Sequence, residues 1–204
     1  MIPELLDKYP LISDQVDRRE LRVVLEQLYR SLDVEGDIVE LGCYQGTSSL
    51  FIRRVLDKTG SSKVFHVYDS FEGLPEKRAQ DQSAAGDQFV AGELRATKKQ
   101  LIDQFKKAGL TPPIIHKGWF ESLTLQDIPD SIAFAFLDGD YYSSIRASLH
   151  LIESRMAPGG IIVVDDYRSE ALPGVARALD EWMRPRGLDI HVEASLGIVH
   201  LSNV

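Results

Sequence analysis

The sequence predicts an α/β protein built on a parallel β-sheet with helices on both faces. Segments with a strand pattern alternate with segments of helical spacing along the 204 residues, and this alternation is typical of parallel sheets. Two unbroken apolar runs, Ile132–Leu137 and Ile161–Val164, have the length of central strands that are covered on both sides. No repeat or linker interrupts the pattern, so we expect one domain over residues 1–204.

An N-terminal helical arm is expected over residues 1–34. Residues 1–12 contain two prolines and resemble a loose segment, after which Ser13 or Asp14 can cap a helix that runs to about Leu32. Apolar side chains recur at helical spacing along this helix, at Leu21, Val24, Leu25, Leu28 and Leu32. One face of the helix should therefore be buried.

The remaining elements follow in order. Strands are expected up to Glu40, over Val64–Tyr68 closing on Asp69, and at Ile114–Ile115, Ile132–Leu137 and Ile161–Val164. Helices are expected up to about Asp57 before Gly60, over Leu94–Ala108 before Gly109, over Tyr142–Arg155 before Pro158-Gly159-Gly160, and over Val175–Met183. A closing hairpin should form from Asp189–Glu193 and Ile198–Leu201 around Gly197.

Composition and charge exclude several classes of protein. The formal charge of −8 argues against nucleic acid as the main partner, because a phosphate backbone needs a basic surface. The single cysteine, Cys43, excludes an intrachain disulfide. No apolar run approaches the roughly 20 residues of a membrane span. The first ten residues carry Glu4 and Asp7 and have no long apolar core, so we expect no signal peptide and a soluble cytoplasmic protein.

The stretch Asp37–Ser49 predicts a strand, a tight turn and the start of a helix. Gly42 and Gly46 let the backbone turn sharply and approach a ligand, and Thr47 or a neighbouring serine can cap the helix. The third glycine of a dinucleotide-binding turn is missing. Glu40 at the strand end suits a cation, so S-adenosylmethionine (SAM), with its amino group and sulfonium, fits this turn better than NAD. The alternative is an ordinary turn whose glycines only serve packing.

Carboxylates follow four of the expected parallel strands. Glu40, Asp69, Asp138 and the pair Asp165 and Asp166 stand at carboxyl ends, where ligands bind in such sheets. Gathered carboxylates repel one another unless a divalent cation joins them. Hard oxygen ligands favour Mg²⁺, with Mn²⁺ and Ca²⁺ as alternatives. We therefore expect a metal at Asp138, Asp165 and Asp166.

Other roles for these acids stay open at this stage. Asp165 and Asp166 can cap their own loop while Asp138 pairs with Arg146 or Arg168. Asp140 is expected either to support a metal ligand or to cap the following helix.

Asp69 begins a turn-rich segment that leads into a long polar connection. Its carboxylate can accept hydrogen bonds from a ribose diol or cap the turn before Ser70. Residues 76–92 are too long for a simple connection, so we interpret residues 70–93 as a lid, with a floppy surface loop as the alternative. Lys77 and Arg78 in this lid are expected to be solvated, although they could hold an anionic substrate.

Four further side chains have two interpretations each. His116 at the end of the third strand is either a structural histidine, which we favour, or a base. Trp119 and Phe120 either flank an adenine ring or pack in the core. Cys43 is either a packing residue, which we favour because no obvious base is paired with it in the sequence, or a nucleophile.

Taken together, five motifs in this order resemble the macrocin O-methyltransferase family, which includes mycinamicin and novobiocin-sugar methyltransferases. The resemblance extends from about Asp37 to Met183. The motifs are Glu40–Gly46 (ELGCYQG), Asp69–Pro75 (DSFEGLP), Gly118–Phe120 (GWF), Leu137–Tyr142 (LDGDYY) and Val164–Tyr167 (VDDY) with Pro173-Gly174.

The resemblance implies a Rossmann-like class I methyltransferase sheet of seven strands with the last antiparallel. It implies Mg²⁺-dependent transfer of a methyl group from SAM to a sugar hydroxyl of a natural product, with a small hydroxylated molecule as partner. Asp138, Asp165 and Asp166 would hold the metal, and Asp138 would act as the base. The expected SAM-binding residues are Glu40, Gly42, Tyr44, Gly46, Ser48, Asp69, Ser70, Gly118, Trp119, Phe120 and Asp138.

The chain departs from the family pattern in two places. It looks short at the N-terminus, where relatives place substrate and subunit contacts, so the acceptor and a homo-oligomeric state stay open. Glu121-Ser122-Leu123 replaces an Asp-Thr-Leu type sequence. The rival hypotheses are a catechol-type O-methyltransferase, an NAD(P) oxidoreductase and a SAM-binding protein without catalysis.

Overall fold

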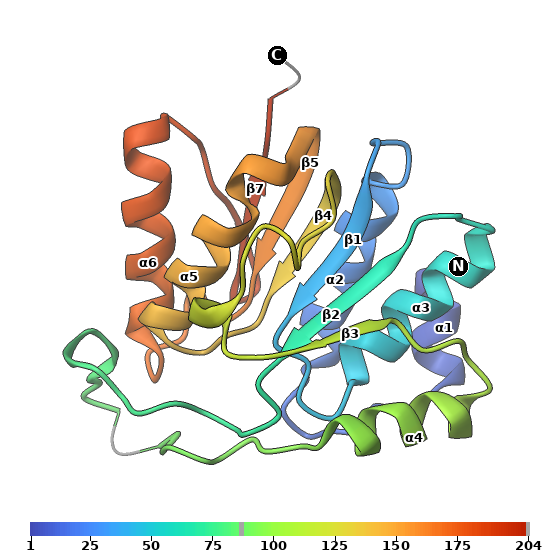
Figure 1. Ribbon diagram of the computed structural model, residues 1–204, viewed down its shortest axis with the longest axis horizontal. Helices are drawn as coiled ribbons and strands as arrows, with labels where there is room; N and C mark the ends of the chain where they lie inside the picture. Colours follow the sequence, from blue (N-terminus) through green and yellow to red (C-terminus); the bar gives the residue numbers. More distant parts are fainter. Residues whose placement is uncertain (86–87, 203–204) are drawn as a thin grey trace.

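Seven strands form one mixed β-sheet at the centre of the protein (Figure 1). The computed structural model describes residues 1–85 and 88–202. The strand order is β3-β2-β1-β4-β5-β7-β6; β7 runs antiparallel to β5 and β6, whereas the other pairings are parallel. The bounds are β1 Asp37–Leu41, β2 Phe65–Asp69, β3 Ile114–Lys117, β4 Ile132–Leu137, β5 Met156–Val164, β6 His191–Glu193 and β7 Leu196–His200. The predicted seven-stranded α/β fold is thus confirmed.

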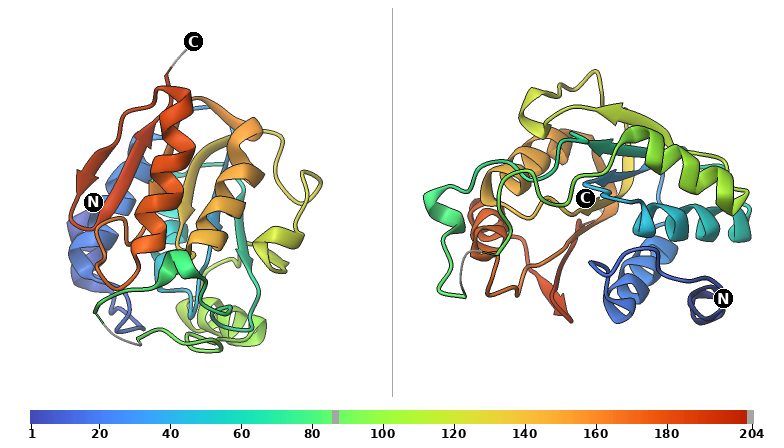
Figure 2. Two further views of the ribbon diagram at one scale, coloured as in Figure 1. Left: turned by 90° about the vertical axis from the view of Figure 1, so that its left-hand side faces the viewer. Right: turned by 90° about the horizontal axis from the view of Figure 1, so that it is seen from below.

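Helices cover both faces of this sheet, as Figure 2 shows from below. One apolar core joins the sheet to α1, α2, α3 and α4, and a second joins it to α5 and α6. The bounds are α1 Ile2–Lys8, α2 Arg18–Arg30, α3 Thr47–Thr59, α4 Lys98–Ala108, α5 Tyr142–Ile152 and α6 Pro173–Met183. None of the helices in residues 1–85 and 88–202 combines the length and the hydropathy that a membrane span requires.

The N-terminal residues pack against the core, so the expectation of a loose segment over residues 1–12 was wrong. Helix α1 tolerates Pro3 because a proline in the first turn gives up an N–H that has no partner in the helix anyway. Its buried side chains are Ile2, Leu5 and Leu6. Helix α2 starts after Asp17, whose carboxylate accepts two of the free N–H groups of the first turn, rather than at Ser13 or Asp14.

Other boundaries also differ from the expectation. Helix α4 begins after Thr97, which forms a reciprocal cap with Gln100, rather than at Leu94. Strand β5 starts at Met156 and includes the residues that were expected to end a helix. The closing hairpin is present, but it turns at residues 194–195, and Gly197 lies inside β7.

Backbone hydrogen bonds continue the sheet past its strand ends and bring the acidic residues to one edge. The N–H of Asp138 donates to the carbonyl of Leu41 over 2.8 Å, and the N–H of Asp165 donates to the carbonyl of Leu137 over 2.9 Å. The residues that follow β1, β4 and β5 are therefore held side by side. This edge of the sheet carries the candidate site.

Candidate active site

A cavity opens at the carboxyl ends of the parallel strands and encloses about 1090 Å³, including its open mouth. Nine of the predicted SAM-binding residues line it: Gly42, Tyr44, Ser48, Asp69, Ser70, Gly118, Trp119, Phe120 and Asp138. Asp165 and Asp166 also line it, whereas Glu40 and Gly46 do not. The structure therefore gathers most of the predicted site in one place.

The turn after β1 depends on Gly42 for a close approach between two strand ends. A Cβ at this position would lie 1.7 Å from the carbonyl oxygen of Asp138, and the φ angle of 93° disfavours any other residue. Gly46, with φ 88°, starts α3 from the left-handed region. Gly42 thus allows the turn to lie directly against Asp138, the residue that begins the acidic loop.

Glu40 lies beneath the turn and is not among the residues that line the cavity, which differs from the expected position at the crevice. Strand β1 extends to Leu41, so alternation directs Glu40 to the α3 face, where Ser49 Oγ donates to its Oε2. Its Oε1 has no hydrogen-bond partner in the described part of the chain. The pKa of Glu40 is raised from 4.5 to about 7, and burial of the carboxyl group is the largest cause. A direct contact with SAM stays a prediction.

Asp69 ties the glycine turn to the end of β2. Its Oδ2 accepts the N–H groups of Cys43 and Tyr44 over 3.0 and 3.3 Å, and its Oδ1 accepts the N–H of Phe71 over 2.7 Å. The turn-capping interpretation is therefore confirmed. The carboxylate also lines the cavity, so the predicted contact with a ribose diol stays a prediction.

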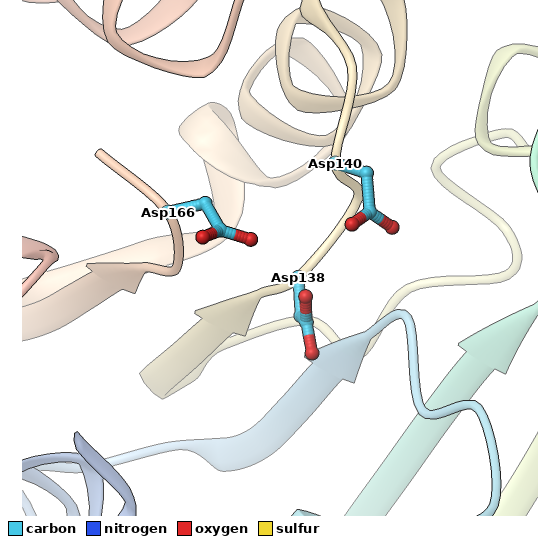
Figure 3. Close-up of side chains that lie close together, drawn as sticks. All are labelled: Asp138, Asp140 and Asp166. Carbon is cyan, nitrogen blue, oxygen red and sulfur yellow. The ribbon is translucent and has the colours of Figure 1, made fainter. Parts of the chain in front are cut away.

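The side chains of three aspartates lie close together at the carboxyl ends of the strands (Figure 3). Ligand oxygens of Asp138, Asp140 and Asp166 all lie within 4.8 Å of one another. Asp140 and Asp166 have φ angles of 60° and 55°, a region that non-glycine residues rarely adopt. Such strain often accompanies a functional arrangement, because the surrounding structure must hold it in place.

Burial and mutual repulsion raise the pKa values of this group. Burial is the largest cause for each, followed by the neighbouring acids, and it raises the pKa of Asp140 to about 7 and of Asp166 to about 6. The pKa values of Asp138 and Asp165 are raised well above their ordinary range. Within residues 1–85 and 88–202, no arginine or lysine lies within ion-pair distance of these acids. The negative charge therefore has no cationic side chain to balance it.

The alternative in which Asp138 pairs with Arg146 or Arg168 was therefore wrong for the described residues. Loop capping is partly confirmed, because Asp165 Oδ1 accepts the N–H of Asp166 over 3.0 Å. Asp165 lines the cavity beside Asp138 but stands outside the three-residue cluster.

The sequence predicted only a supporting role for Asp140, either beside a metal ligand or as a helix cap. It does not cap α5, because the N-cap of that helix is Tyr141 and no side chain of the cap bonds to the first turn. The signal was present in the spacing Asp138-Gly139-Asp140, which puts two carboxylates on one short loop after a buried strand. Ser13, Gln15 and Val16 also line the cavity, and nothing in their sequence indicated this.

A sequence model of the family described as "Macrocin-O-methyltransferase (TylF)" matches residues 13–195. The chain belongs to this family. The match covers most of the chain and confirms the resemblance in the five motifs.

Two curated relatives of this macrocin O-methyltransferase family member are named as O-methyltransferases. It is 35% identical over 145 residues to 8-demethyl-8-(2,3-dimethoxy-alpha-L-rhamnosyl)-tetracenomycin-C 4'-O-methyltransferase of Streptomyces olivaceus, covering 68% of this chain and 55% of the relative. It is 29% identical to demethyldecarbamoylnovobiocin O-methyltransferase of Streptomyces niveus, covering 74% and 59%. The chain thus spans less than two thirds of the length of these relatives.

Solved structures show the same fold. The O-methyltransferase NovP superposes with a TM-score of 0.79 at 21% identity, covering 92% of this chain and 81% of NovP. The calicheamicin methyltransferase CalS11 superposes with a TM-score of 0.74 at 18% identity, covering 98% and 89%. This family member therefore has the class I methyltransferase fold, confirming the expectation.

Two candidate side chains of the family member have structural roles. His116 stacks on Tyr68, and its Nε2 lies 3.0 Å from Nδ1 of His66, away from the cavity lining, so the structural interpretation is confirmed. Cys43 is buried, and burial raises the pKa of its thiol well above the ordinary value. A thiolate is disfavoured there, which supports a packing role.

Backbone hydrogen bonds join the two ends of the lid segment, residues 70–93, and the segment contributes to the cavity wall. The N–H of Leu74 donates to Glu93, and the N–H of Gly92 donates back to Leu74. Phe89 and Leu94 line the cavity. Residues 86 and 87 of the lid lie outside the described residues. Opening and closing of this segment stays a prediction.

Proposed function

We propose that the chain is a SAM-dependent O-methyltransferase that methylates a hydroxyl of a sugar carried by a natural product. The observation that carries the proposal is the acidic cluster at the wall of a large cavity in a member of this family. The names of the relatives support it, since the tetracenomycin enzyme is named for a rhamnosyl 4'-hydroxyl.

The cavity suits SAM by its shape and charge. Trp119, with 36% of its surface exposed, offers an aromatic face for an adenine ring, and Asp69 offers a carboxylate for a ribose diol. Oε1 of Glu40 has no hydrogen-bond partner among the described residues, so this carboxyl group can still accept a hydrogen bond beneath the glycine turn. A ligand that carries an amino group and a sulfonium would relieve the repulsion among these acids.

The acidic residues also suit a divalent cation. Asp138, Asp140, Asp165 and Asp166 are half-buried and have no basic partner among the described residues, and carboxylate oxygens are the hard ligands that suit Mg²⁺. We assign the metal to Asp138, Asp165 and Asp166, with Asp140 facing the same space. When bound, the cation would stabilise the alkoxide form of an acceptor hydroxyl, whose pKa otherwise lies near that of water, ~16.

One carboxylate must take the proton of the acceptor hydroxyl. The hydroxyl oxygen then takes the methyl group from the sulfonium of SAM. Asp138 is the proposed base because it belongs to the cluster and lines the cavity. Asp140 is the second candidate, since its pKa of about 7 matches a general base at neutral pH. Asp140→Asn separates the two, because it leaves all three assigned metal ligands in place.

Calorimetry with SAM, with and without Mg²⁺, tests the proposal against its rivals. We expect SAM to bind, NAD(P)H not to bind, and a chelator to stop methyl transfer to rhamnoside probes. Asp138→Ala and Asp165→Ala should abolish turnover and leave SAM binding largely intact. Asp130→Ala, an exposed acid at the opposite edge of the sheet, is the matched control. Near-normal turnover after chelation would refute the metal assignment, and tight NAD(P)H binding would refute the methyltransferase.

A further inference from the structure

A buried carboxylate outside the acidic cluster lies at the start of two helices. Asp81 is the last residue of the short helix η1 (Ala79–Asp81) in the lid, and it is fully buried. Its Oδ1 accepts the N–H of Tyr142 in the first turn of α5 over 2.7 Å, and its Oδ2 accepts the N–H of Arg78 over 3.2 Å. Within residues 1–85 and 88–202, no basic side chain lies at ion-pair distance from Asp81. Backbone N–H groups are therefore the partners of this carboxylate.

Helix α5 receives from Asp81 the cap that its own N-terminus does not supply. The N-cap residue is Tyr141, whose side chain makes no hydrogen bond to the first turn. The first N–H groups of a helix have no partner within the helix and carry partial positive charge, so a carboxylate placed there is stabilised and stabilises the helix. Asp81 reaches this position from 61 residues earlier in the chain. The start of α5 thus depends on a contact from the lid.

Helix α6 begins against the same carboxylate. A Cβ added to Gly174, in the first turn of α6, would lie 2.0 Å from Oδ1 of Asp81 and 2.8 Å from the backbone nitrogen of Tyr142. Any larger residue would have to push one of these neighbours away. Gly174 belongs to the Pro173-Gly174 pair of the family motifs, and this close packing gives the glycine a physical reason. Helices α5, α6 and η1 therefore meet at the Asp81 carboxylate.

The two loops that carry the acidic cluster lead directly into these helices. Asp140 stands two residues before Tyr142. Asp166 is joined to the start of α6 by turns, because the N–H of Ser169 donates to the carbonyl of Asp166 over 3.0 Å and the N–H of Leu172 donates to that of Ser169 over 3.3 Å. Both aspartates have positive φ angles, 60° and 55°, which persist only where the surrounding structure holds them. The fixed starts of α5 and α6 provide this restraint.

Two further hydrogen bonds join the lid to the same loops. The hydroxyl of Tyr141, directly after Asp140, donates to the carbonyl of Phe89 in the lid. Ser83 Oγ, also in the lid, donates to the carbonyl of Glu170 in the loop before α6. Each acidic loop is thus held by the lid both within the loop and at the start of the helix that follows it.

We propose that Asp81 is a positioning residue, which fixes the loops of Asp140 and Asp166 for cation binding by holding the starts of α5 and α6. The inference rests on the proposed function, which supplies the cation. Asp81 does not line the cavity, so it acts only through the two loops. The glycine turn expected to hold SAM is fixed instead by Asp69. Loss of the Asp81 carboxylate should therefore weaken cation binding more than SAM binding.

The variant Asp81→Ala tests this role with Tb³⁺, a hard cation that binds carboxylate oxygens and whose emission is sensitised by nearby aromatic side chains such as Trp119 in the cavity wall. Since partners behind metal ligands typically contribute tenfold or more to metal affinity, we expect Tb³⁺ to bind roughly tenfold more weakly. SAM affinity should stay close to the wild-type value. Asp81→Asn keeps an amide oxygen for the N–H of Tyr142 and loses only the bond to Arg78, so it should retain most of the Tb³⁺ affinity.

Amide hydrogen exchange follows the same contact without any cation. The N–H of Tyr142 should exchange faster in Asp81→Ala than in the wild type, because its acceptor is gone. Asp127→Ala is the matched control: Asp127 also caps a turn, by accepting the N–H of Thr124 over 2.9 Å, but lies outside the cavity lining. The control should lower the melting temperature and leave both the exchange of Tyr142 and the Tb³⁺ affinity unchanged. An equal fall in Tb³⁺ affinity in the control would tie cation binding to overall stability and refute the positioning role.

If Asp81→Ala does not fold, Gly174→Ala displaces the carboxylate by a second route and should weaken Tb³⁺ binding in the same direction. Wild-type Tb³⁺ affinity in a folded Asp81→Ala or Gly174→Ala variant would overturn the positioning role and leave the proposed function intact. Equal losses of Tb³⁺ and SAM affinity would also overturn it, because they would show a general disturbance of the cavity. Absence of Tb³⁺ binding to the wild type would instead overturn the metal assignment, and the positioning role with it.

Discussion

Glu40 offers the sharpest test of how burial controls this site. The Glu40→Gln variant removes the ionisable group of this side chain while keeping its size and an acceptor for Ser49. The wild-type carboxyl is fully buried, and its pKa in the folded protein is about 7 against 4.5 when solvated. The ligand-free protein therefore binds the proton more tightly than the unfolded chain does.

The size and sign of the effect follow from linkage. A tenfold difference in proton affinity is worth about 1.4 kcal/mol, so the rise from 4.5 to about 7 corresponds to about 3 kcal/mol. Because the folded pKa is raised, this contribution to stability is fully present below pH 4.5 and is lost as the pH rises through 7. As the pH rises, the unfolding free energy of the wild type should thus fall by about 3 kcal/mol relative to that of Glu40→Gln, and most of this fall should occur between pH 5 and 7.

Urea denaturation of both proteins across pH 4.5 to 8.5, without SAM, measures this difference. The quantity to compare is the difference between the unfolding free energies of the wild type and the Glu40→Gln variant, because the other titratable groups contribute equally to both proteins. Glu35→Gln, at an exposed position before β1, is the control and should show a gap that stays constant. A gap for Glu40→Gln that does not grow with pH would refute the argument that burial suppresses this charge.

Three further outcomes are expected. Gly42→Ala should lower the unfolding free energy by more than about 3 kcal/mol, because its Cβ would meet the backbone of Asp138 at 1.7 Å; a urea midpoint near the wild type would contradict this. Lys63→Met should cost roughly 1–2 kcal/mol in thermal unfolding, since its ammonium donates to two backbone carbonyls before β1; an unchanged melting temperature would count against that role. Trp119→Ala should weaken SAM binding roughly tenfold and remove SAM-dependent fluorescence quenching, because Trp182 is buried on α6; quenching that persists would place the ligand elsewhere.

Much of the fold was predictable because its signals are local. The apolar run Ile132–Leu137 can only be satisfied between two covering layers, and it is indeed fully buried as β4. The helix ends at Gly60 and Gly109 were also predictable, since both adopt the left-handed conformation that glycine favours. The errors arose where a contact with a distant segment decided the outcome, as for α1, which packs against the core through Ile2, Leu5 and Leu6.

The acidic site was likewise only partly predictable from the sequence. Acids at or just after the carboxyl ends of β1, β2, β4 and β5 are visible in the sequence, and alternating strands and helices place these ends on the same side of the sheet. Which oxygens meet there is a matter of register and loop conformation. Asp140 joins Asp138 and Asp166 through a left-handed backbone that no local pattern predicts.

The sequence by itself determined the alternation of strands and helices, the glycine turn and the edge of the sheet where acids gather. Only the tertiary structure decided that Glu40 is buried beneath that turn, that Asp140 faces the cluster, and that Asp81 joins the lid to α5 and α6. The physical reason is that periodicity and turn chemistry act over a few residues. Burial and charge repulsion depend on segments that the chain brings together from far apart.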